Sequence, residues 1–249
     1  MRFSCLNWGN LIKSFQKIDG SWPWKWQHDK PGGVVETVAA IDILSKYNIT
    51  KVRPAISFIC SIQREDGGWS ENPRLTSFIP NNWIFWRTDC SSAFFTGKSL
   101  FTLIKSGYKD SIFVKKGINY LQETQNEEGG WPLNSDPQYT RSDPICTNSA
   151  IKAFIEIEHY QNSKILKKAL KSIEKNYSKW MKILAQTSEP LTACSILDSL
   201  IILDPKSSKI LDLLNYIIRI QREDGGWGWN KEPSDPDITL KCFELTTRS

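Results

Sequence analysis

The sequence offers few residues that could hold a metal or a cofactor. It has only two histidines, His28 and His159, and its six cysteines lie far apart without a CxxC pair. Neither a zinc site nor a disulfide framework is therefore expected. There is no DDxxD run for a magnesium-bound diphosphate, and the Gly-Gly pairs precede Trp rather than Lys-Ser or Lys-Thr, unlike a phosphate-binding loop. We expect no metal and no cofactor.

Long apolar runs are also missing. Residues 1–16 contain no run of signal-peptide length, and no segment approaches the roughly 18 apolar residues of a membrane span. The net charge of +5 is scattered over predicted helix surfaces, and no basic stripe alternates with aromatic residues. Nucleic acid is therefore not an expected partner. We predict a cytoplasmic protein.

The sequence does contain an internal repeat. Residues 63–69, QREDGGW, return unchanged as residues 221–227, and looser copies occupy residues 16–22 and 125–131. Residues 174–180 make a degenerate copy that keeps the Trp but has lost the Gln and the glycines. The copies recur at a period of roughly 47 to 62 residues, which indicates repeated supersecondary units.

Each repeat is predicted to contain two helices. Amphipathic outer helices are expected at 3–15, 51–62, 111–124, 163–175 and 207–220. More apolar inner helices are expected at 35–47, 90–104, 145–159, 191–203 and from 238 onwards, each opening with a hydroxyl residue in a common frame: Thr37, Ser91, Thr147, Thr192 and Thr239. The prediction is one all-α domain over residues 1–249.

The motif resembles the QW repeat of the terpenoid cyclases, which include squalene–hopene cyclase and oxidosqualene cyclase, with weaker relatives in protein prenyltransferase β subunits. The resemblance implies an α/α toroid, an open or closed barrel here of about five helix pairs, in which Gln and Trp tie one outer helix to the next. The family ring is usually closed by about six pairs. We therefore expect either an open ring or a partner that closes it.

The same resemblance suggests catalytic residues. Oxidosqualene cyclases have a DCTAE signature and squalene–hopene cyclases a DxDD signature at the start of an inner helix, and Asp89 coincides with the proton-donating acid of both. Cys90 coincides with the Cys of DCTAE, and Cys146 with a second cysteine that bonds the acid. Two features depart from these patterns: Arg87 replaces the first Asp of DxDD, and Ser91 and Ser92 replace Thr-Ala.

Protonating an alkene or an epoxide requires a neutral acid that can lose its proton, followed by aromatic faces that stabilise the carbocation. The long connection 70–88 is unusually aromatic, and two further rings follow on the inner helix. The predicted substrate-binding residues are Phe78, Trp83, Phe85, Trp86, Phe94 and Phe95.

Simple helix capping explains the acids equally well. Asp89 precedes Ser-Ser as an N-cap would, and we interpret Glu36, Asp143 and the DPDIT string 235–239 as helix-start residues, with Asp237 as the cap of the last helix. The enzyme hypothesis is a class II, proton-initiated terpene cyclase acting on a linear isoprenoid, with Asp89 as general acid. The alternative is a non-catalytic α/α repeat protein that binds a hydrophobic ligand or a protein. Expected partners are the isoprenoid, a homodimer or second cyclase-type domain, and a membrane surface contacted peripherally.

Overall fold

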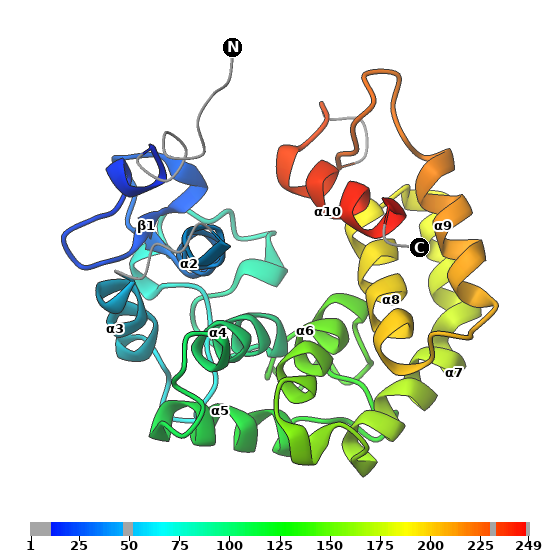
Figure 1. Ribbon diagram of the computed structural model, residues 1–249, viewed down its shortest axis with the longest axis horizontal. Coiled ribbons are helices and arrows are strands. Elements are labelled where there is room, and N and C mark those ends of the chain that lie inside the picture. The colour runs from blue at the N-terminus through cyan, green and yellow to red at the C-terminus, as the bar shows by residue number, and fades with distance from the viewer. Residues whose placement is uncertain (1–10, 47–51, 230–232, 248–249) are drawn as a thin grey trace.

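The computed structural model describes residues 11–46, 52–229 and 233–247 and is mostly helical (Figure 1). Strands in this described part are limited to one antiparallel pair, β1 (Trp22–Pro23) with β2 (Gly32–Gly33). The inner helices are α2 (Val34–Lys46), α4 (Ala93–Lys105), α6 (Pro144–Ile155), α8 (Pro190–Leu203) and α10 (Pro236–Thr247). The outer helices are α3 (Arg53–Ser61), α5 (Ile112–Glu123), α7 (Lys164–Thr187) and α9 (Lys209–Arg219). The predicted all-α fold is confirmed.

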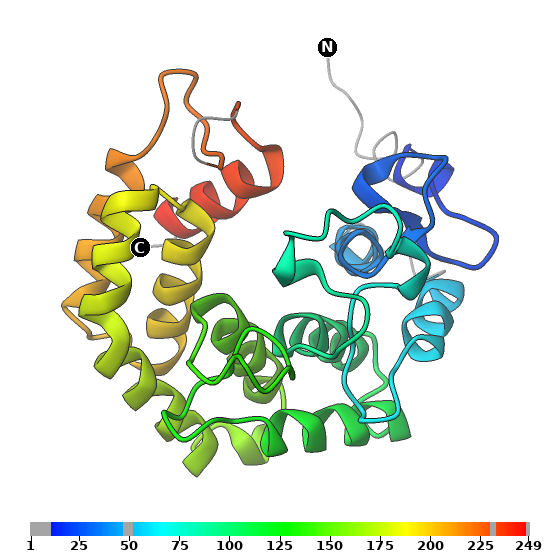
Figure 2. The same cartoon turned by 180° about the vertical axis from the view of Figure 1, so that it is seen from behind.

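The helix pairs form a horseshoe (Figures 1 and 2). Successive inner helices pack on one another from α2 to α10, and the outer helices follow the convex side. A gap separates α2 from α10 in both views, so the described residues form an open ring. Short 3₁₀ turns at Trp24–Trp26, Pro73–Leu75, Ile84–Trp86 and Glu158–Tyr160 lie in the connections.

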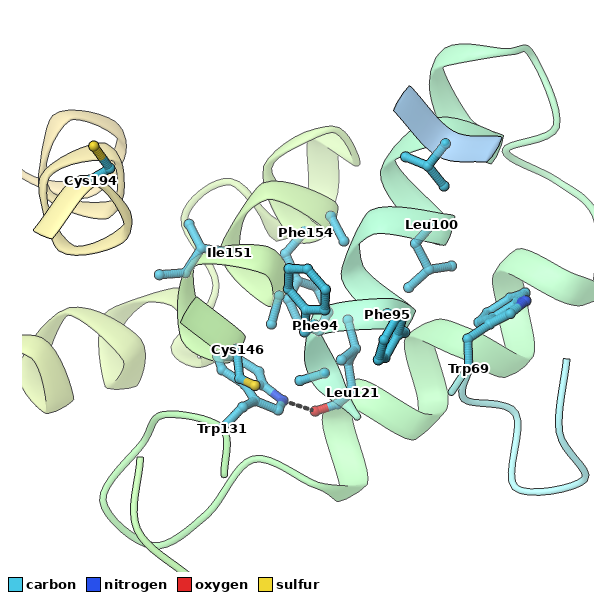
Figure 3. Close-up of a cluster of buried hydrophobic side chains, with 14 of the residues drawn as sticks. Trp69, Phe94, Phe95, Leu100, Leu121, Trp131, Cys146, Ile151, Phe154 and Cys194 are labelled. Atoms are coloured by element: carbon cyan, nitrogen blue, oxygen red, sulfur yellow. Dashed lines mark hydrogen bonds between the residues drawn. The ribbon is translucent and has the colours of Figure 1, made fainter. Parts of the chain in front are cut away.

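Each motif tryptophan joins an outer helix to an inner helix. The indole Nε1 of Trp69 donates to the Ile59 carbonyl at the end of α3 (2.8 Å), while its backbone N–H donates to Thr96 Oγ1 in α4 (2.9 Å). Trp131 repeats both bonds, to Leu121 and Thr147, and Figure 3 shows the first of them. Trp22 and Trp227 do the same. The large ring is buried and both of its donors are satisfied, which makes each Trp a fixed point of packing.

The motif glutamine and glycine hold the next outer helix. Gln63 Nε2 donates to the Gly67 carbonyl within the turn and to the Phe113 carbonyl at the start of α5 (2.8 and 2.9 Å). Gly67 has φ +84°, and a Cβ there would meet the Lys116 carbonyl oxygen at 2.6 Å. Glycine is required for both reasons, because an L side chain would be strained in that conformation and would displace α5.

The last motif makes only half of these contacts. Gln221 Nε2 donates to the Gly225 carbonyl (2.7 Å), and among the described residues no other acceptor is found for it. Gly225 keeps φ +82°, yet no described atom lies within 4 Å of a Cβ built on it. The turn has its local shape, but the surface that receives an outer helix in the earlier repeats is open here.

Two predicted features differ in the structure. The helix expected at 163–175 continues to Thr187, and the degenerate motif 174–180 lies inside α7, because without Gly and Gln nothing ends the helix there. Ser91 was predicted to be the hydroxyl residue of the second repeat that is equivalent to Thr37 and Thr147. This prediction was wrong, because Thr96 is the residue that accepts from the motif Trp there. The helix predicted at 3–15 falls largely outside the described residues.

The turns of the two identical motifs, residues 63–69 and 221–227, give a matched pair of substitutions. Gly225→Ala should cost about 1–2 kcal/mol of unfolding free energy from the left-handed backbone alone. Gly67→Ala should cost about 1–3 kcal/mol more, because its Cβ also pushes on α5. Chemical denaturation of both variants measures the difference, and equal losses would show that the turn does not hold the next helix.

Candidate active site

Asp89 lies in the connection between the 3₁₀ turn Ile84–Trp86 and α4, and it is ion-paired. Arg87 donates to both of its carboxylate oxygens, from Nε (2.8 Å) and Nη2 (2.6 Å), and to Asp136 from Nη1 (2.6 Å). The hydrogen bonds from Arg87 lower the pKa of Asp89, and 65% of the Asp89 side chain is exposed. A bidentate guanidinium favours the carboxylate, so Asp89 is ionised in this structure.

Asp89 is not the helix cap that its sequence context suggested. Ser92 occupies the N-cap position of α4, and its hydroxyl accepts from the backbone N–H of Phe95 (3.3 Å). The capping interpretation of Asp89 was therefore wrong, because the helix begins three residues later than expected. The other capping interpretations had mixed outcomes.

Asp143 is an N-cap as predicted, accepting from the backbone N–H of Cys146 (2.8 Å). The prediction that Asp237 caps the last helix was wrong, because Asp235 accepts from the backbone N–H of Ile238 (2.9 Å) and Asp237 lies within α10. Glu36 is not a cap of its own helix, because it accepts from the backbone N–H of Lys25 (2.8 Å). Glu71 instead accepts from Val34 at the start of α2 (2.7 Å).

The two predicted cysteines occupy different positions in their repeats. Cys146 immediately precedes Thr147, which accepts from Trp131, whereas Cys90 stands six residues before Thr96, which accepts from Trp69. Cys146 is buried, burial raises its pKa, and its Sγ donates to the Leu133 carbonyl (3.4 Å). The bonds among the described residues join Asp89 to arginines, not to either cysteine.

Four of the six predicted aromatic residues form one cluster. Phe85 and Trp86 pack on Phe94, with ring centroids 4.8 and 6.3 Å apart, and Trp86 also contacts Phe95 at 5.8 Å. Figure 3 shows Phe94 and Phe95 on α4, facing the core shared with α6. Trp83 and Phe78 lie apart from this cluster, where Trp83 contacts Trp24 and both receive lysine ammonium groups on their faces.

A cavity of about 410 Å³ lies elsewhere, between the 133–144 connection and the α7 and α8 helices. Among its lining residues are Leu133, Asp143, Trp180, Ile183, Glu189 and Thr192. A smaller cavity of about 190 Å³ is bounded by Ala93, Tyr120 and residues of the same connection. None of the six predicted substrate-binding residues lines either one.

Asp143 is one of the two carboxyl groups that line the larger cavity, and Glu189 is the other. Burial raises its pKa, although the backbone N–H groups of Cys146 and Ile145 oppose the shift. The carboxyl is thus kept closer to its neutral form than Asp89 is. The sequence contained a signal for this residue, the Asp-Pro at the start of an inner helix, which we had interpreted only as a cap.

The sequence analysis missed a buried pair of acids, Glu36 and Glu71. Glu71 is fully buried, Glu36 is nearly so, and each has one carboxyl oxygen without a hydrogen-bond partner. Burial first, and then the charge of Glu36, raise the pKa of Glu71 to about 8. In the described part of the chain no three His, Cys, Asp or Glu side chains are grouped to hold a metal ion, and no helix is both long and apolar enough to traverse a membrane.

Comparison with known proteins identifies the family. Residues 7–143, more than half of the chain, match the squalene-hopene cyclase C-terminal domain. The chain belongs to this family.

Individual relatives agree with this assignment. The chain is 33% identical over 122 residues to a squalene–hopene cyclase of Zymomonas mobilis subsp. mobilis (49% of this chain, 18% of that protein) and 28% identical over 136 residues to lanosterol synthase ERG7 of Saccharomyces cerevisiae (50% and 17%). The matched region therefore spans less than a fifth of those relatives.

Solved structures show the same fold. The apo type II terpene cyclase MstE from Scytonema superposes with a TM-score of 0.64 at 13% identity, covering 90% of this chain and 65% of that chain. A variant of it in complex with merosterolic acid A (product) gives a TM-score of 0.68 at 13% identity, with 98% and 80% coverage.

The raised pKa of Glu71 predicts a pH-dependent stability. An acid whose pKa lies near 8 in the folded state and near 4.5 when unfolded favours the folded state below 4.5 and loses that contribution as pH rises to 8. We expect the unfolding free energy to fall over this range in the wild type and to vary less in Glu71→Gln. Urea titrations at several pH values measure this, and the exposed Glu65→Gln should follow the wild type. A wild-type stability that rises between pH 5 and 8 together with an unchanged slope in Glu71→Gln would contradict it.

Proposed function

We propose that this chain is a domain of a class II terpenoid cyclase, which starts the cyclisation of a linear isoprenoid by protonating it and uses no cofactor. Membership in the squalene-hopene cyclase family carries the proposal. The relatives are described as squalene–hopene cyclases and lanosterol synthases, and one solved neighbour was crystallised with geranylgeranyl dihydroxybenzoate (substrate).

The proposed acid must be neutral before it reacts, and the two candidate carboxyl groups, Asp89 and Asp143, differ in how readily they hold a proton. Asp89 is the acid that the family signatures indicate, with Cys90 and Cys146 as its proposed neighbours. It can serve only if substrate binding releases it from Arg87 and lets it regain a proton. Asp143 already has a raised pKa, lines the 410 Å³ cavity and adjoins Cys146, so the geometry favours it as proton donor.

The proposed carbocation stabilisers are the aromatic residues of the cluster around Phe94. Their ring faces attract a cation without offering a base that would quench it. Trp83 and Phe78 lie outside the cluster and would join it only through a movement of the 70–88 connection.

A non-catalytic repeat protein remains the second candidate. The ion pair between Arg87 and Asp89 favours it, because that carboxylate is held in its unreactive form. In this case the same scaffold binds a hydrophobic ligand or a protein.

We further propose that an outer helix from a second cyclase-type domain packs on the open end of the ring. Among the described residues nothing packs on the Gln221 and Gly225 turn, whereas equivalent turns receive an outer helix, and α9 and α10 carry exposed apolar side chains. These are Leu211, Ile218, Leu240 and Phe243. If light scattering shows a homodimer, the partner at the open end is a second copy of this chain and not a second domain. Binding to lipid vesicles through these residues would contradict the proposal that a helix packs there.

Substitution of the two acids tests the enzyme hypothesis. We expect one of Asp89→Asn and Asp143→Asn to reduce product formation from a linear polyprene or its terminal epoxide by about 100-fold or more. Asn caps a helix as well as Asp does, so the melting temperature of Asp143→Asn should change little. Product is measured by gas chromatography with mass detection.

Asp235→Asn is the matched control, because Asp235 is an N-cap at the position equivalent to Asp143. It should retain full activity. Loss in Asp89→Asn alone would assign the acid to Asp89, and loss in Asp143→Asn alone would assign it to Asp143. Turnover that survives in both variants would reject proton donation by either acid and favour the binding protein.

A further inference from the structure

Charged side chains meet in the centre of the horseshoe, away from Asp89 and Asp143. Asp198 of α8 is buried, and its Oδ2 lies 2.8 Å from Lys241 Nζ of α10 and 3.6 Å from Lys152 Nζ of α6. One carboxylate is therefore shared by two ammonium groups that come from different inner helices.

The repeat register places these groups on equivalent helix faces. Lys152 and Asp198 each stand nine residues after the N-cap of their helix. Lys98 and Lys241 each stand six residues after the N-caps of theirs, which are Ser92 and Asp235. Positions three residues apart lie on one face of a helix. The Lys241–Asp198 and Lys152–Asp198 contacts cross between inner helices, and the charges of Asp42 on α2 and Lys241 on α10 both act on Lys98 of α4. This face is therefore turned toward the space that the inner helices surround.

Lys98 has no ion-pair partner among the described residues. It is half-buried, its Nζ lies 5.2 Å from the ring centroid of Phe94, and no described carboxylate lies within 4.0 Å of it. Burial, and then the charges of Lys152 and Lys241, lower its pKa to about 8, while Asp237 and Asp42 act weakly in the opposite direction. Asp198 thus pairs with two ammonium groups, while Lys98, which is repelled by both of them, has only the weaker attraction of Asp237 and Asp42.

We propose that Lys98, Lys152 and Lys241 bind a multivalent oxyanion of the phosphate or diphosphate type in the centre of the ring. Such an anion would meet ammonium donors from three inner helices in surroundings where charge interactions are stronger than in water. The Lys98 ammonium lies against Phe94, whose ring also contacts Phe85 and Trp86. An anion that carries an apolar chain would place that chain toward these aromatic rings. This site does not depend on which acid, if either, donates a proton.

Calorimetric titration with inorganic diphosphate tests the site in the full chain. Lys98→Gln should weaken binding at least about tenfold, and Asp198→Asn should strengthen it several-fold by releasing two lysines. Lys105→Gln is the control on the same helix, since Lys105 pairs with Glu156 outside the cluster (2.7 Å), and it should bind as the wild type does. Thermal melts monitored by circular dichroism confirm that each variant is folded.

The source of the anion is decided by a second titration with a prenyl diphosphate and the corresponding prenyl alcohol. Tighter binding of the prenyl diphosphate than of both inorganic diphosphate and the alcohol, lost in Lys98→Gln, identifies a head group. Equal binding of inorganic and prenyl diphosphate identifies a free anion. No binding of diphosphate to the wild type, or equal binding to Lys98→Gln, overturns the proposal, and neither result bears on whether a neutral polyprene is cyclised.

Discussion

The fold depends on the hydrogen bonds of the motif tryptophans. Each indole N–H ends an outer helix by binding a carbonyl ten residues earlier in the chain, and each Trp backbone N–H binds a threonine hydroxyl of the following inner helix. A single residue therefore fixes both helices of a pair, and its buried ring fills the space between them. The ring curves as it does because this unit recurs with the same geometry, and the glutamine and glycine of the turns in motifs 63–69 and 125–131 join those units to the next outer helix.

Electrostatic surroundings separate acids that look alike in the sequence. Asp89 is exposed and held by Arg87, so its pKa is lowered, whereas burial raises the pKa of Asp143 and of Glu71. The difference has a simple origin. A guanidinium stabilises the charged form, while burial without a cation penalises it. An acid that must be neutral before it gives up its proton needs the second kind of environment, which Asp143 has at the start of α6 and Glu71 has in the connection before α4.

The inner helices differ from an apolar lining because they bring charges to the ring centre. Lys152, Asp198 and Lys241 come from three helices that are distant in sequence, and they approach because every inner helix presents an equivalent face. Desolvated ammonium groups are costly unless an anion accompanies them. The shared Asp198 supplies part of that compensation, and the remaining charge on Lys98 distinguishes this centre from a packed hydrophobic core.

The sequence by itself determined the repeat, the all-α class, most helix positions and the family, because the Gln, Gly and Trp of each motif act within a short stretch of chain. It also placed Asp143 as a cap, which depends on local N–H groups. Only the tertiary structure decided that Arg87 neutralises Asp89, that Cys90 and Cys146 stand in different registers, and that Trp83 and Phe78 leave the aromatic cluster. Those outcomes depend on which groups each side chain pairs with and on how deeply it is buried. Both depend on residues that come together only when the helices pack. The acid pair of Glu36 and Glu71 and the lysines of the ring centre were invisible in the sequence for the same reason.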